Sequence, residues 1–112
     1  MSNTSKFIAE LVCAANNLEK QNDLELNQLV EDTIHVIHHL RRLAGVTAKP
    51  NASDPIFELQ FISAAITIGW ATPTRVKMAL LEAAGTIRDL RVILYNKARG
   101  ISAREDPDSR QN

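Results

Sequence analysis

The sequence DPIFELQFISAAITIGWA, residues 54–71, decides how the rest of the chain is organised. It opens with a helix-start signal. Asp54 can cap the first turn, and Pro55 suits the first helical position because it has no N–H to leave unpaired. No charged residue occurs between Glu58 and Arg75. At 100° per residue, apolar side chains cover well over half of this helix, more than the stripe of an ordinary surface helix. We therefore expect neighbours on at least two of its sides.

Helical periodicity continues on both sides of this stretch. Asp23 can cap a second helix that ends at Gly45, and the Thr72-Pro73 pair repeats the start signal for a fourth. The first expected helix covers about residues 5–21, and the second has roughly 20 residues after its cap at Asp23. The third begins at Asp54 and is ended by Gly69 to Thr72, and the fourth covers residues 73–99. A strand over residues 60–69 is the alternative, because short apolar runs fit both structures. The Asp-Pro start and the lack of a hairpin partner favour the helix.

The fourth helix indicates the architecture. Its main apolar row is Val76, Leu80, Ala83, Ile87, Leu90 and Leu94. A helix over residues 73–99 would be about 40 Å long, whereas a compact chain of this size has a radius of gyration of about 13 Å. We therefore predict one all-α domain over residues 1–100, a four-helix antiparallel bundle-like subunit completed by homodimerisation. Residues 101–112 are predicted to be a charged, disordered tail.

A second apolar strip on the fourth helix suggests where two chains meet. Met78, Leu81 and Val92 lie roughly opposite the main row, with Gly85 between them. Small residues such as glycine allow another helix to approach closely. The predicted dimer-interface residues are Ile62, Ile66, Met78 and Gly85.

Composition narrows the class of protein. Apolar residues make up 45% of the chain, and 13 basic residues balance 13 acidic ones. The balance gives no overall field that would attract nucleic acid or an acidic membrane. One cysteine excludes an internal disulfide. The uncharged run at 59–74 is shorter than the ~20 residues that span a bilayer, and no signal peptide is visible. We expect a soluble, cytoplasmic protein.

Candidate chemistry is sparse. His35 and His39 stand one turn apart on a helix and could share a metal ion, with His38 beside them and Asp32 a turn before. A polar outer face is the simpler interpretation, and a partner surface with pH-sensitive binding is a second one. Cys13 lies beside the apolar stripe of the first helix and is expected to be a small buried residue. No nucleophile or phosphate-loop motif occurs, so we expect no enzyme, no cofactor and no metal.

DNA binding is a rival function. The region 71–100 has a local excess of basic residues, and a basic helix can contact phosphates. However, Arg88 and Arg91 alternate with Glu82 and Asp89, a pattern more typical of a solvated face. The sequence has no short helix–turn–helix pair with a basic recognition helix.

Two stretches resemble a known family. LVEDTIHVIHHLRRLAG at residues 29–45 and FELQFISAAITIGWATP at 57–73, in a small all-helical chain, are similar to the bacterial quorum-sensing antiactivators of the QslA type, and more loosely to those of the TraM type. The resemblance covers about residues 5–100. It implies a non-enzymatic helical dimer that binds the ligand-binding domain of a LuxR-type, LasR-like transcription factor. Binding would block dimerisation of the regulator and would therefore prevent it from binding DNA.

A protein that replaces a dimer partner needs apolar surface left over after its own folding. The wide apolar arc of the third helix and the second strip of the fourth could supply it. The predicted partner-binding residues are Phe57, Phe61, Ile68, Leu81 and Val92, with Arg42 and His39 at the rim. The alternatives are a helical dimerisation or adaptor module with no role in transcription, or a small DNA-binding protein.

Overall fold

The structure is a computed structural model that describes residues 2–46, 54–98 and 100. These residues form four α-helices and one short 3-10 helix. The elements are α1 (Ser2–Asn16), η1 (Leu18–Lys20), α2 (Asp23–Ala44), α3 (Pro55–Ile68) and α4 (Pro73–Ala98). Every regular element in the described part of the chain is helical, which confirms the all-α prediction and rules out the strand over 60–69. The predicted tail at 101–112 lies outside the described residues, as do residues 47–53 between the second and third helices.

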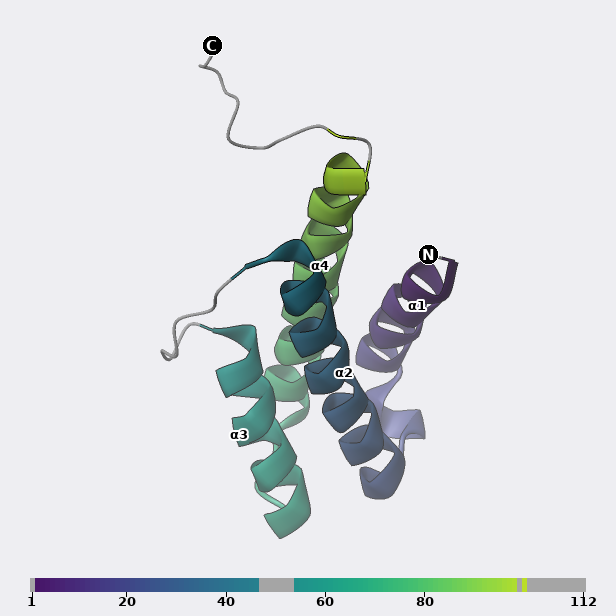
Figure 1. Ribbon diagram of the computed structural model, residues 1–112. Helices are drawn as coiled ribbons and strands as arrows, with labels where there is room; N and C mark the ends of the chain where they lie inside the picture. The colour runs from purple at the N-terminus through teal and green to yellow at the C-terminus, as the bar shows by residue number, and fades with distance from the viewer. Residues whose placement is uncertain (1, 47–53, 99, 101–112) are drawn as a thin grey trace.

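Consecutive helices run in opposite directions, and α4 is the helix that the other three share. α2 packs against both α3 and α4, whereas α1 packs chiefly against α4. Figure 1 shows α2 and α3 side by side, α4 behind them, and α1 on the far side of α2. The four helices thus form an antiparallel bundle in which α1 has one principal neighbour.

The helix ends follow local signals. The side chain of Asp54 accepts from the backbone N–H of Ile56, so it caps α3 as predicted. Gly45 and Gly69 end α2 and α3 with φ of 74° and 80°, a left-handed conformation in which glycine carries no steric penalty. The prediction for the start of α2 was wrong by one residue. Asn22 is the cap, and its Oδ1 accepts from the Glu25 N–H at 2.7 Å.

The core confirms the main apolar row of α4. Of that row, Leu94 is half-buried and the others are buried; they are Val76, Leu80, Ala83, Ile87 and Leu90. Ala79 and Ala84 are buried beside the row. The prediction for Cys13 was wrong, because Cys13 is exposed. Leu11 and Ala15 of α1 are buried, and residues two apart on a helix point to different sides. Since α1 rests mainly on one helix, only a narrow arc of it is covered.

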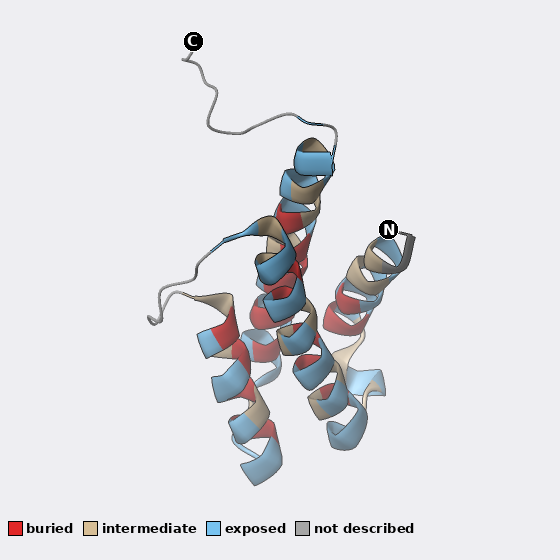
Figure 2. Cartoon of the chain, viewed as in Figure 1, coloured by how far each residue is buried: buried red, intermediate tan, exposed pale blue. Residues whose placement is uncertain are grey.

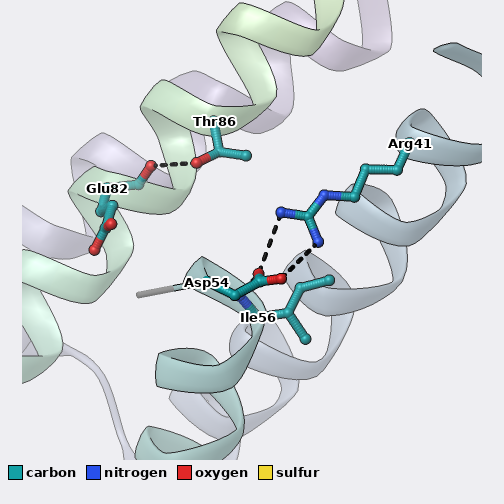
Figure 3. Close-up of polar contacts among 5 residues, drawn as sticks. All are labelled: Arg41, Asp54, Ile56, Glu82 and Thr86. Carbon is teal, nitrogen blue, oxygen red and sulfur yellow. Dashed lines mark hydrogen bonds and ion pairs between the residues drawn. The ribbon is translucent and has the colours of Figure 1, made fainter. Parts of the chain in front are cut away.

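An ion pair fastens the end of α2 to the start of α3 (Figure 3). Arg41 donates two hydrogen bonds to the carboxylate of Asp54, each 3.2 Å long. The two side chains are only 14% and 11% exposed, so the pair is far better shielded from water than a typical surface ion pair. Asp54 therefore has two structural roles, the cap of α3 and the partner of Arg41.

Candidate partner-binding faces

One side of α3 remains apolar and solvent-exposed in the single chain. Phe57, Phe61 and Ile68 are 52%, 49% and 59% exposed. They recur at spacings of four and seven residues, so they line one strip of the helix. Figure 2 shows α3 with its exposed segments on the outside and its buried segments toward the other helices. This strip, called here the α3 face, is where the predicted partner-binding residues of α3 lie.

The opposite side of α3 fills the core, and this corrects part of the predicted dimer interface. Ile62 is fully buried and Ile66 nearly so, both within the hydrophobic core of the subunit. Their side chains are already packed against the chain's own helices, so they are not accessible to a second copy. The interface prediction placed them wrongly because an apolar arc of that width fits more than one orientation.

A narrow polar strip on α3 consists of Gln60, Ser63 and Thr67. The Ser63 hydroxyl lies 2.6 Å from Asn27 Oδ1 and 3.0 Å from Glu31 Oε2, the two possible acceptors of its one hydrogen, and Asn27 donates to Thr67 at 3.2 Å. These contacts orient Ser63 and Thr67 toward α2, although Gln60 and Thr67 remain exposed. With this side of α3 next to α2, Phe57, Phe61 and Ile68 of the apolar arc face solvent.

Arg75 of α4 lies at the edge of the α3 face. Its guanidinium is 4.3 Å from the centroid of the Phe61 ring, a cation–π arrangement. The same group donates to both carboxylate oxygens of Glu58, at 2.7 and 3.2 Å. The hydrogen bond to Glu58 raises the pKa of Arg75 above its usual value. A fixed positive charge therefore borders the exposed aromatic ring, a contact that the sequence analysis missed because the two residues belong to different helices.

The outer side of α4 carries the remaining predicted residues on a single strip. Met78, Leu81 and Val92 are exposed, and Gly85 is half-buried between them. Their spacing places all four along one side of the helix. From the sequence, Leu81 and Val92 are predicted to bind the regulator, whereas Met78 and Gly85 are predicted to form the dimer interface. One strip of one helix cannot serve both partners at the same time, so we treat it as one surface, the α4 strip.

The predicted rim residues stand apart from the α3 face. His39 and Arg42 are exposed on α2, where Arg42 Nη2 lies 3.5 Å from His39 Nδ1. Arg41, which does reach the start of α3, is two residues from His39 and therefore points to a different side of α2. His35 and His38 are exposed as well. Within the described ranges, no three histidine, cysteine or acidic side chains gather as metal ligands.

The end of the bundle near η1 exposes two further large apolar side chains. Trp70 is 79% exposed and Leu24 is 81% exposed. A cavity of about 320 Å³ at this end is bordered by η1, the start of α2, the end of α3 and the start of α4. Its lining includes Leu26, Ile66 and Val76 together with the acidic residues Glu19 and Asp23, but neither of the two exposed side chains. Neither Trp70 nor Leu24 is among the site residues predicted from the sequence.

Comparisons of this chain with protein-family models, with curated proteins and with solved structures found no match. A search of the described residues also found no helix long and apolar enough to cross a membrane.

Proposed function

We propose that this chain is a non-enzymatic, cytoplasmic antiactivator that forms a homodimer and binds the ligand-binding domain of a LuxR-type transcription factor. The observation that carries the proposal is the α3 face. Two phenylalanines and an isoleucine are about half exposed on one strip, directly opposite residues that are fully buried. Clustered exposed apolar side chains on a folded chain usually mark an interaction site.

The chemistry of the α3 face suits a protein partner. Large apolar and aromatic side chains tend to supply the energetic centre of an interface, and charged groups at its edge contribute specificity. Phe57 and Phe61 would be the anchors, with Arg75 as the charged neighbour that is already oriented by Glu58. A face of this kind could take the place of a regulator's own dimer partner.

The proposed mechanism is competition. LuxR-type regulators must pair to hold a two-fold symmetric site, because a dimer matches two half-sites on the DNA. If the α3 face covers the surface through which the ligand-binding domain pairs, the regulator remains a monomer and no longer binds its promoter. The proposed chain then needs no contact with DNA.

The test is binding of a LuxR-type ligand-binding domain to the intact chain, measured by size-exclusion chromatography with light scattering. Phe61→Arg and Phe57→Arg should each weaken binding about 30-fold or more, the scale of losing an interface anchor. Phe57→Arg is included because Phe61→Arg also places a second cation beside Arg75. Gln60→Arg is the matched control, since it adds the same charge at an exposed polar position of α3.

Each outcome separates the functions. A mixed complex with one regulator copy, lost in both phenylalanine variants and kept in the Gln60 variant, supports the proposal. Unchanged affinity in folded Phe57→Arg and Phe61→Arg chains contradicts the placement of the site. A chain that ignores LuxR-type domains altogether would instead be a helical adaptor module.

A further inference from the structure

The α4 strip has the spacing of a helix-pairing seam. Arg88 and Tyr95 continue the strip, and from here on we include them in it. Its positions then alternate at intervals of three and four residues; they are Met78, Leu81, Gly85, Arg88, Val92 and Tyr95. This is the a/d pattern by which two helices share a seam over several turns. Met78, Leu81, Arg88 and Val92 are all exposed in the single chain, so the seam faces outward rather than into the core.

Gly85 is not explained by the packing of the subunit. It lies in the middle of α4, where glycine destabilises a helix relative to alanine. A Cβ at this position would meet only the Arg88 guanidinium, 3.9 Å away, at the end of a flexible side chain. The subunit therefore has room for alanine here. The close approach of another helix would require glycine.

We propose that two copies of this chain pair through the α4 strip with their α4 helices antiparallel, so that Gly85 of each copy receives Arg88 of the other. This inference rests on the homodimer in the proposed function and does not require the regulator. In this register Leu81 lies opposite Val92 of the second copy, and Met78 lies opposite Tyr95. The two-fold axis passes between positions 86 and 87, close to the middle of Pro73–Ala98, so almost the whole helix takes part.

Charge favours this register. Glu82 and Asp89 follow directly after Leu81 and Arg88, so they lie along one flank of the strip. In the antiparallel pair, Arg88 extends across Gly85 of the second copy, between that copy's Glu82 and Asp89. Among the described residues of one chain, Arg88 pairs only with Asp89, at 3.7 Å, and both side chains are mostly exposed. The arginine is therefore available to a second copy.

A parallel pair is disfavoured by the same residues. It would place Arg88 directly against Arg88, so two like charges would oppose each other. The charges along the strip therefore match better when one helix is reversed. The second copy of this chain is thus the occupant that the strip fits.

Engineered disulfides distinguish the two directions. The variant Leu81→Cys/Val92→Cys, made in a Cys13→Ser background, should oxidise to a covalent dimer, because a disulfide needs Cα atoms about 4.4–6.8 Å apart. Each single variant should not cross-link, since in this register Leu81 is offset from its own copy by about 16 Å along the axis. The matched control is Leu24→Cys/His35→Cys, an exposed pair on α2 with the same separation in sequence.

Sedimentation at micromolar concentration completes the test. A dimer whose double variant cross-links, while the single variants and the α2 control do not, supports the antiparallel seam. Cross-linking of a single variant to itself would overturn the antiparallel direction. A dimer that does not cross-link at positions 81 and 92 overturns the seam and leaves the homodimer standing. A monomer overturns both.

Discussion

The inner and outer rows of α3 and α4 are similar in composition and opposite in environment. The residues of the inner rows are all buried; they are Leu59, Ile62 and Ile66 of α3 and Val76, Leu80 and Ile87 of α4. The residues of the outer rows are all exposed; they are Phe57, Phe61 and Ile68 of α3 and Met78, Leu81 and Val92 of α4. Helical spacing alone does not separate them. On α3, the rows differ because polar residues between them hydrogen-bond to α2 and so determine which side of the helix is covered.

The largest contrast is expected between two adjacent positions of α3. Ile62→Arg should unfold the chain, because burying a charge without a partner costs several kcal/mol out of a total stability of about 5–15 kcal/mol. Phe61→Arg places the same charge one residue away, at a half-exposed position, and should leave the fold intact. Far-ultraviolet circular dichroism during thermal unfolding measures both. A folded Ile62→Arg chain would contradict the inner assignment.

A smaller contrast is expected on α4. Ile87→Ala should lower the free energy of unfolding by about 2–5 kcal/mol, since it leaves a cavity at a fully buried site. Val92→Ala should change it by less than about 0.5 kcal/mol when the protein is dilute. Urea titration at several protein concentrations checks both values. A loss at Val92 that appears only at high concentration would show that a second copy covers the outer row.

Gly85→Ala sharpens the comparison further because it should raise the stability of the subunit and lower the affinity of the two copies for each other. Alanine should stabilise the isolated subunit by about 0.5–1 kcal/mol through its higher helix propensity. Pairing through the α4 strip should weaken, because the added methyl group occupies the place of Arg88 from the second copy. Urea titration of dilute protein gives the first effect and sedimentation gives the second. An Ala variant that pairs as well as the original chain would speak against the close approach.

The smallest effect is expected at the border between the rows. Arg75→Met should lower the melting temperature slightly, by loss of the exposed pair with Glu58. Because the hydrogen bond to Glu58 raises the pKa of Arg75, the contribution of the charged group is complete below the pKa of the unfolded chain and is lost only as the pH rises through the raised folded value, far above neutral. The difference between the two proteins should therefore not depend on the ionisation of Arg75 between pH 6 and pH 9, and it should shrink with added salt. Thermal unfolding over that range measures it.

Most of the fold could be predicted because its signals are local. The Asp54-Pro55 start, Gly45 and Gly69 all act within a turn of their own helix, and the structure bears out each of them. The Asn22 cap was missed by one residue, because both Asn22 and Asp23 have a suitable side chain. The inner row of α4 could be predicted because its side chains are apolar at every helical turn.

The orientation of α3 could not be predicted for a tertiary reason. Its polar strip hydrogen-bonds to Asn27 and Glu31 of α2, and no periodicity within residues 54–71 encodes that contact. The same limit applies to Cys13, which is exposed because α1 has one principal neighbour. Sequence thus identified Phe57 and Phe61 as candidates, while the three-dimensional contacts separated them from Ile62 and Ile66.

The central position of α4 also affects the order in which the helices can pack during synthesis. It is the last of the four helices along the chain, yet α1, α2 and α3 all pack against it. During synthesis, α2 and α3 can pair early through a short connection, whereas α1 must wait for a partner that begins at Pro73. The apolar stripe of α1 is therefore expected to stay uncovered on a nascent chain until α4 has been made.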